Sequence, residues 1–93
     1  MIRTFADPET ERIWNRGRSR KLPPDIQQRA MRKLTLLDAA ITLDDLGNLR
    51  GNRLHALKDD RAGQHSISIN DQWRICFVWK DGDAYDVEIA DYH

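Results

Sequence analysis

The last three residues of the chain bring together side chains that suit proton transfer beside an unpaired nucleobase. Asp91, Tyr92 and His93 directly continue an alternating, strand-like segment. Histidine exchanges a proton near neutral pH, a carboxylate can act as a base or orient the imidazole, and tyrosine can stack on a base. The alternative is a pinned strand end whose polar side chains only meet solvent.

Three further polar residues could complete such a site. Arg74 lies inside an apolar run, where a charge is costly unless it faces a polar cleft. A cross-strand ion pair with Glu88 or Asp86 explains that position equally well. His55 and Lys58 are three residues apart, although an exposed lysine is usually just solvated. Cleavage of an RNA phosphodiester needs what this set offers, because protons move at the 2′-hydroxyl and the leaving oxygen while Lys and Arg stabilise the phosphorane.

Metal and disulfide chemistry are disfavoured. The chain has one cysteine, Cys76, which excludes an internal disulfide, and its three histidines lack the spacing of a metal site. Cys76 lies in the apolar run 75–79, so we expect a buried strand thiol rather than a reactive one. His65, near the start of a predicted strand, is expected at the surface or at a sheet edge. We therefore predict no metal ion and no other cofactor.

Composition and length indicate one globular domain over residues 1–93. The chain has no net charge, with 40% hydrophobic and 32% charged residues, which is typical of a soluble folded protein. The charge is uneven, because residues 1–33 carry nine Lys and Arg against four Asp and Glu. A basic half suggests a patch for phosphate or for an acidic partner, although a solvated helix surface would have the same composition. No apolar run reaches the roughly 20 residues that span a bilayer. Residues 1–6 lack a signal-peptide pattern, so we expect a cytoplasmic protein away from membranes.

Helical signals dominate the first half of the chain. Residues 2–5 alternate weakly and could form a short strand. Asp7 and Pro8 are typical of a helix start, which predicts a helix over residues 9–15 that stops near Gly17. A second helix should begin at residues 23–25, and residues 42–46 could form a further short turn. The second helix has apolar residues at spacings of four, four, three and four, namely Ile26, Ala30, Leu34, Leu37 and Ile41.

The hydrophobic period changes to two from residue 53 onward. Strands are predicted over residues 53–57, 66–69 and 72–79, followed by a final strand in which Tyr85, Val87 and Ile89 share a face. Tight turns are expected at residues 70–71 and 80–83. The pattern predicts an α+β domain, with an N-terminal strand and two to three helices packed on one face of a mainly antiparallel sheet. The side chains expected to face the helices are Ile67, Ile69, Ile75, Phe77, Val87 and Ile89. The opposite face, expected to be open to a ligand, presents Ser66, Ser68, Arg74 and Cys76.

Four ordered segments resemble the HigB-type toxins, which belong to the RelE-like superfamily and to bacterial type II toxin–antitoxin systems. The segments are GNRLHALK at 51–58, DRAGQHSI at 60–67, NDQWRICF at 70–77 and the terminal DYH. Chain length and the order of helices before sheet also agree, so the resemblance covers essentially the whole chain. His65 is a mild departure, because many relatives carry an aromatic residue such as Trp there.

The resemblance implies an activity, partners and roles for individual residues. It implies a metal-independent, ribosome-dependent endoribonuclease (an mRNA interferase) that cuts translated mRNA. It also implies a HigA-type helix-turn-helix antitoxin, with operator DNA bound only through that antitoxin. Catalytic roles fall on His55, Lys58, Arg74, Asp91, Tyr92 and His93. Binding of RNA or the ribosome is assigned from charge to Arg16, Arg18, Arg20, Lys21, Arg53 and Arg61.

Two other hypotheses remain open from the sequence. The domain could be a weakly active or inactive binding module that acts mainly through the antitoxin complex in operon autoregulation. It could also be a plain structural domain, in which case the polar residues above would be dispersed over the surface. The distances between Lys58, Arg74 and the chain end distinguish this last hypothesis from an enzyme.

Overall fold

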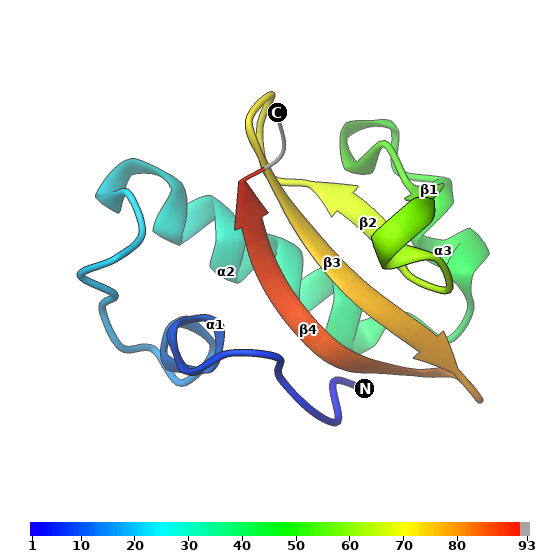
Figure 1. The fold of residues 1–93 in the computed structure, drawn as a ribbon, viewed down its shortest axis with the longest axis horizontal. Coiled ribbons are helices and arrows are strands. Elements are labelled where there is room, and N and C mark those ends of the chain that lie inside the picture. Colours follow the sequence, from blue (N-terminus) through cyan, green and yellow to red (C-terminus); the bar gives the residue numbers. More distant parts are fainter. Residues whose placement is uncertain (92–93) are drawn as a thin grey trace.

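The computed structural model describes residues 1–91 as helices packed against a four-stranded antiparallel sheet (Figure 1). The strands lie in the order β1-β2-β3-β4, and α2 runs behind β3 and β4 in the view of Figure 1. The predicted α+β class is confirmed. The elements, with η denoting 3₁₀ turns, are α1 (Pro8–Trp14), α2 (Pro24–Ala39), α3 (Leu43–Gly47), η1 (Arg50–Asn52), β1 (His55–Ala56), η2 (Asp59–Arg61), β2 (His65–Ser68), β3 (Trp73–Lys80) and β4 (Asp83–Asp91).

Helix α1 begins where the sequence predicts it. The Asp7 carboxylate accepts a hydrogen bond from the Thr10 amide at 2.8 Å, and Pro8 occupies the first turn. The Thr10 hydroxyl, which is fully buried, donates to Asp7 and accepts from the Ile89 amide of β4 at 2.9 Å. The cap that starts the helix therefore also attaches it to the sheet.

Helix α2 buries the predicted apolar stripe except at its last position. The side chains of Ile26, Ala30, Leu34 and Leu37 are at most 3% exposed. Ile41 is 77% exposed, so its assignment to the stripe is wrong. The helix ends at Ala39 and Ala40 is extended with ψ 137°, which takes Ile41 away from the stripe. A capping box then starts α3.

The helix-facing side of the sheet forms the core with all three α-helices of the described chain. The six residues predicted to face the helices are all buried there, as the prediction requires: Ile67, Ile69, Ile75, Phe77, Val87 and Ile89. Strands β3 and β4 are joined by the expected tight turn, in which Asp81 and Gly82 both have positive φ (53° and 81°). Two such residues form the turn type whose twist matches antiparallel strands.

A bulge in β4 changes the phase of the final strand. Cys76 pairs with Glu88, but Val78 pairs with Tyr85, so β4 has one residue more than β3 in this interval. Asp86 has φ 52° at this point. The face assigned to Tyr85 is therefore wrong: Ala84 is fully buried, whereas Tyr85 is only half-buried.

The N-terminal segment lies beside the bulged part of β4. Ile2 and Phe5 form isolated parallel bridges with Ala84 and Val87, rather than the continuous short strand expected at residues 2–5. The Thr4 hydroxyl accepts a hydrogen bond from the Asp86 amide at 2.8 Å, which satisfies the donor that the bulge leaves without a ladder partner. No helix within residues 1–91 is both long and apolar enough to cross a membrane.

Candidate active site

The sheet face opposite the helices is polar yet largely buried. Ser66, Ser68, Arg74 and Cys76 lie on this face, as predicted, but none is more than 7% exposed. The expectation that these side chains are open to a ligand is therefore wrong. The η2 turn that follows β1 lies in front of the sheet in Figure 1, and its Arg61 contacts Glu88 on this side. His55, at the β1 end of this face, is exposed.

Arg74 is the central residue of this face. Its Nε donates to the Ser66 hydroxyl at 2.7 Å, and its Nη2 donates to the Arg53 carbonyl at 2.6 Å. The same Nη2 lies 3.4 Å from Nδ1 of His55. Because a guanidinium can only donate, this contact favours the His55 tautomer that carries its proton on Nε2. Strand pairing, not sequence proximity, brings Arg74 and His55 together.

Arg53 contributes its backbone carbonyl to the site. It ends η1 in the left-handed conformation, with φ 45°, which is why the strand predicted over 53–57 is reduced to β1. This conformation is uncommon for a residue with a Cβ atom. The exposed Arg53 side chain pairs with Asp71 at 3.3 Å. The predicted RNA-binding role therefore concerns only its side chain, while the carbonyl fixes Arg74.

A partly buried contact with α2 holds η1 in place. Nζ of Lys33 donates to Oδ1 of Asn52 at 2.6 Å, and Nδ2 of Asn52 donates to the Leu46 carbonyl at 3.0 Å. Asn52 is fully buried. Burial lowers the pKa of Lys33, with smaller contributions from the positive charges of Arg29 and Arg32. The sequence pattern gives no signal for this contact, because its two partners are 19 residues apart.

The connection after β1 carries two other predicted residues. Lys58 is exposed three residues after His55, and its carbonyl accepts from the Arg61 amide in η2. The Arg61 side chain is half-buried and donates to Glu88 at 3.0 Å. Four residues that pair from strand to strand form a row across the sheet, from His55 through Ser66 and Cys76 to Glu88. Arg61 therefore contacts the end of this row that is farthest from His55.

Cys76 lies in the middle of that row and is a buried thiol, as predicted. Burial raises its pKa, and the positive charges of Arg61 and Arg74 only partly oppose this effect. A thiol that stays protonated is a poor nucleophile. Within residues 1–91, no three His, Cys, Asp or Glu side chains are grouped so that they could hold a metal ion.

Asp91 ends β4 one rung beyond Arg74. It pairs with Trp73, and its Oδ2 accepts from Nε2 of Gln72 at 3.2 Å. Because paired residues point to the same side of a sheet and Trp73 packs against the core, Asp91 lies at the end of β4 on the helix-facing side, not on the face of Arg74. Tyr92 and His93, which complete the predicted catalytic set, lie outside the described residues.

His65 occupies a different environment from the one expected. It lies in β2 between β1 and β3, and its ring stacks on Phe77 with centroids 6.3 Å apart. It is half-buried, and its Nδ1 has no hydrogen-bond partner among the residues that the structure describes. The predicted edge position is wrong, because β1 pairs with the outer side of β2.

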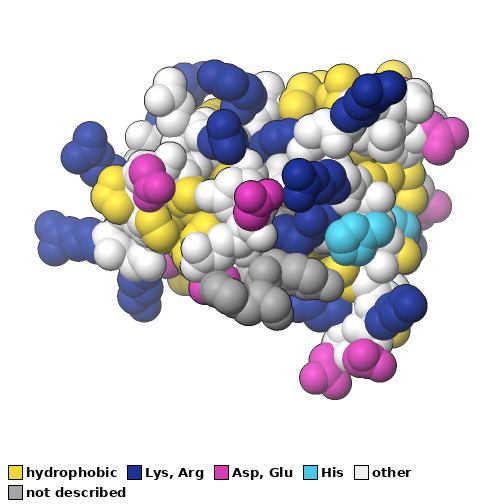
Figure 2. All heavy atoms as spheres, turned by 90° about the horizontal axis from the view of Figure 1, so that it is seen from above, with side chains coloured by type: hydrophobic (Ala, Val, Ile, Leu, Met, Phe, Trp, Pro, Cys, Tyr) yellow, Lys and Arg dark blue, Asp and Glu magenta, His cyan; other side chains and the backbone are white. Residues whose placement is uncertain are grey.

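Figure 2 looks onto the end of the molecule that includes part of this site. Lys and Arg side chains lie across the middle of this view, next to histidine. A separate group of basic side chains projects from the left edge, where Figure 1 places the loop between α1 and α2.

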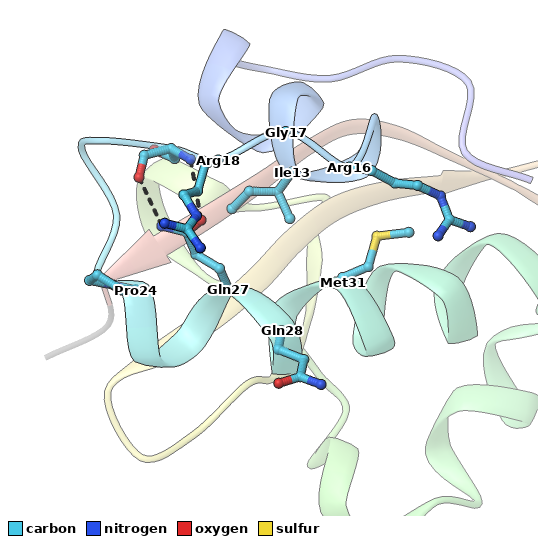
Figure 3. Close-up of a pocket in the computed structure, with 9 residues that line it drawn as sticks. Ile13, Arg16, Gly17, Arg18, Pro24, Gln27, Gln28 and Met31 are labelled. Carbon is cyan, nitrogen blue, oxygen red and sulfur yellow. Dashed lines mark hydrogen bonds between the residues drawn. The ribbon is translucent and has the colours of Figure 1, made fainter.

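The basic α1–α2 loop lies apart from the Arg74 group. Arg16, Arg18, Arg20 and Lys21 are all exposed, and β1 is at the opposite side of the molecule (Figure 1). The Ser19 hydroxyl donates to Glu9 of α1 at 2.7 Å. Gln27 of α2 donates to the Ser19 carbonyl at 2.9 Å (Figure 3), so the loop is held against both helices. Arg16 and Arg18 border a hollow of about 490 Å³ that Ile13 and Met31 also line.

Comparison with known proteins identifies the family. The model of the HigB-like toxins, described as the RelE-like toxin of type II toxin–antitoxin system HigB, matches residues 3–93. The chain belongs to this family. It is 33% identical over 93 residues to the protein named Endoribonuclease HigB from Proteus vulgaris, with both chains fully covered. It is 42% identical over 85 residues to Toxin HigB-1 from Vibrio cholerae, with 90% of each chain covered.

Solved structures agree on the fold at low sequence identity. The YoeB–YefM complex from Staphylococcus aureus matches with a TM-score of 0.61 at 14% identity, covering 100% of this chain and 98% of the other. YafQ from E. coli matches with a TM-score of 0.56 at 10% identity, covering 98% and 93%. The predicted RelE-like fold, the toxin class and an antitoxin partner are thus confirmed. The prediction of an endoribonuclease is confirmed at the level of the family.

Proposed function

We propose that this HigB-like toxin cleaves mRNA on the translating ribosome, using the polar face around Arg74. The observation that carries this proposal is the buried Arg74 guanidinium, fixed by Ser66 and the Arg53 carbonyl beside His55. A pre-oriented charge stabilises a transition state better than a mobile one, because no reorganisation is needed as charge develops. Arginine stays protonated at any physiological pH.

Each predicted residue has a role in this scheme. Arg74 and Lys58 stabilise the phosphorane formed when the 2′-oxygen attacks the phosphate, and His55 binds that phosphate or assists proton transfer. His93 acts as general acid or base, with Asp91 as base or orienting group, and Tyr92 stacks on an mRNA base. The reaction forms a 2′,3′-cyclic phosphate and releases the 5′-oxygen as a hydroxyl. No metal ion takes part in this proposal.

The remaining basic residues bind RNA in this proposal. Arg53 and Arg61 lie next to the Arg74 site and hold mRNA phosphates there. The α1–α2 loop, which carries Arg16, Arg18, Arg20 and Lys21, binds ribosomal RNA at a distance from the cleavage site. The charge of all six residues supports this assignment, as does the exposure of Arg53 and of the four loop residues, while Arg61 is half-buried.

The proposed partner is a HigA-type helix-turn-helix antitoxin that neutralises the toxin in the cytoplasm. Operator DNA is bound through the antitoxin alone. Membership in a type II toxin–antitoxin family supports a protein antitoxin, while its HigA type and the contact with DNA belong to this proposal.

Primer extension on a reporter mRNA tests the proposal directly. The purified toxin is added to a reconstituted translation reaction and, separately, to the same mRNA without ribosomes. We expect breaks at ribosome-bound codons in the first reaction and intact RNA in the second. Intact message in both reactions would overturn the proposal.

Growth arrest separates catalysis from binding. Expression of wild-type toxin should stop growth, whereas Arg74→Ala and a deletion of His93 should not. Equal arrest by all three proteins would mean that arrest does not come from this site. That result would favour the binding-module hypothesis.

A further inference from the structure

A polar groove runs between the first half of α2 and the turn that joins β2 to β3. It consists of two hollows of about 370 and 220 Å³, and Arg29 and Asn70 line both of them, so the hollows are adjoining. The first is also lined by Asp25, Ile26, Gln28 and Arg32. The second is also lined by Gly51, Arg53, Ser68, Ile69 and Asp71.

The walls of this groove are fixed by hydrogen bonds. The Asn70 side chain accepts from the amides of Gln72 and Trp73 at 2.8 and 2.7 Å, which fixes the turn. The Ser68 hydroxyl donates to the Asn70 carbonyl at 2.8 Å. Nη1 of Arg29 reaches across to the Ile69 carbonyl at 3.4 Å. The groove is therefore largely formed before any ligand binds.

Three arginines line the groove against two acids, Asp25 and Asp71, so its net charge is positive by one. Arg29 and Arg32 are exposed on α2, and both lower the pKa of the neighbouring Lys33, so these three cations repel one another. Arg53 at the other end pairs with Asp71, a residue that is 96% exposed. A screened, exposed ion pair of this kind contributes little and exchanges readily for a phosphate. Figure 2 shows several Lys and Arg side chains at this end of the molecule, with an acidic side chain among them.

The groove begins beside the Arg74 site. Ser68 and Arg53 line its second hollow, Ser68 pairs with Arg74 across the sheet, and the Arg53 carbonyl accepts from Arg74. A strand of RNA whose scissile phosphate lies at Arg74 can therefore continue over Arg53 toward Arg29 without crossing the core.

We propose that this groove binds the phosphate backbone of single-stranded RNA that flanks the cleaved bond, with Arg29 and Arg32 as its phosphate ligands. The inference rests on the proposed function and extends its substrate site by a further segment. Arginine suits this task because its planar fork matches the phosphate oxygens. The acid Asp71 acts against RNA binding, which makes its removal informative.

Salt-dependent RNA binding tests the groove independently of cleavage. The probe is a 12-nucleotide single-stranded RNA with 2′-O-methyl groups throughout, which cannot be cleaved by 2′-oxygen attack. Fluorescence anisotropy gives the affinity of the full-length toxin at several salt concentrations. We expect Arg29→Ala/Arg32→Ala to bind about tenfold more weakly at low salt. Its slope of log affinity against log salt should be shallower by about 1.4, which is two phosphate contacts at about 0.7 each.

Three matched variants make this result specific. Arg3→Ala/Arg12→Ala removes the same charge from two other exposed arginines and should keep the wild-type slope. Arg29→Lys/Arg32→Lys keeps the charge and should retain most of the slope, while Asp71→Asn should tighten binding.

Two outcomes are decisive and remain separate from the test of cleavage. Equal slopes of log affinity against log salt for wild type and Arg29→Ala/Arg32→Ala would overturn the proposal that this groove binds RNA, even if the toxin cuts mRNA. Equal losses in the Arg29→Ala/Arg32→Ala and Arg3→Ala/Arg12→Ala proteins would also overturn it, because net charge alone would then explain binding. A normal groove result with no cleavage in translation would instead count against the proposed function.

Discussion

In the middle of the sheet, along β2 and β3, the two faces are similarly buried but are held together in different ways. Along β2 and β3, Ile67 and Ile75 face the helices, while the alternate residues Ser66 and Arg74 face the other side, and all four are at most 7% exposed. The first face is filled by apolar side chains of α2, and the second is organised by hydrogen bonds of 2.6–2.7 Å around one guanidinium.

This contrast implies that the same depth of burial serves two purposes. Apolar contacts are non-directional and depend mainly on the area removed from water. A buried charge is tolerated only when its donors are satisfied in fixed directions. Substitutions on the helix-facing side should therefore change the free energy of unfolding, whereas substitutions on the Arg74 side should change the rate of RNA cleavage more than stability.

The largest loss of stability is expected for Leu34→Ala in the core. Leu34 is fully buried, so its truncation leaves a cavity that costs about 3 kcal/mol of unfolding free energy. Urea unfolding followed by tryptophan fluorescence measures this change. Gln28→Ala on the exposed side of the same helix should change it by less than about 0.5 kcal/mol. Equal effects of the two substitutions would contradict the assignment of the core.

A smaller loss of unfolding free energy is expected for Asn52→Ala. Asn52 connects the helical side of the molecule with the backbone that holds Arg74. The change leaves the Leu46 carbonyl and the Lys33 ammonium without their buried partner, which costs about 2 kcal/mol. Because Asn52 precedes the carbonyl that holds Arg74, cleavage by the folded fraction should also fall about tenfold. Exposed Asn48→Ala is the control. Wild-type cleavage by folded Asn52→Ala would show that η1 does not position Arg74.

Among the substitutions with a small effect on stability, Ser66→Ala should distinguish the roles of the two sheet faces most clearly. It removes one acceptor of Arg74 and costs about 1 kcal/mol of stability, with a roughly tenfold loss of cleavage. Thr10→Val removes a buried hydroxyl at the helix-facing side and should cost similar stability without changing cleavage per folded molecule. Stability and single-turnover cleavage are measured on the same preparations. Equal losses of cleavage in Ser66→Ala and Thr10→Val would contradict the idea that only the Arg74 face acts in catalysis.

The smallest effect concerns Cys76 and pH. Burial raises the pKa of this thiol, so the folded state keeps its proton at a pH where the unfolded chain loses it. The resulting stabilisation is complete below about pH 8.5 and is lost as pH rises above that value. Urea midpoints between pH 7 and pH 10 should therefore fall more steeply for wild type than for Cys76→Ala. Parallel pH profiles would contradict the raised pKa.

Local patterns in the sequence predict most of the fold. The Asp7 cap, the α2 stripe and the Asp81-Gly82 turn depend on neighbouring residues, and all three are present. The predictions fail where one backbone conformation overrides the pattern. The positive φ of Asp86 changes the face of Tyr85, and that of Arg53 shortens β1.

The candidate site is predictable only in its residue types. The alternation of β3 places Arg74 on the polar face, but neither its burial nor its partners Ser66 and Arg53 follow from local sequence. The Lys33–Asn52 contact joins two segments that only the tertiary fold brings together. These supporting contacts are long-range, so composition and spacing carry no signal for them.

The most direct test of the account compares Arg74→Lys with the wild-type toxin in a translation reaction. Lysine keeps the positive charge but cannot reach Ser66, the Arg53 carbonyl and the His55 ring at once. The control is Arg3→Lys, an exposed arginine paired with Asp83 on the far side of β4 from the site. With both variants shown to be folded by near-ultraviolet circular dichroism, Arg74→Lys should cut ribosome-bound mRNA at least about 100-fold more slowly. Arg3→Lys should cut at the wild-type rate. A folded Arg74→Lys protein that cleaves mRNA as fast as wild type would contradict the central role of this guanidinium.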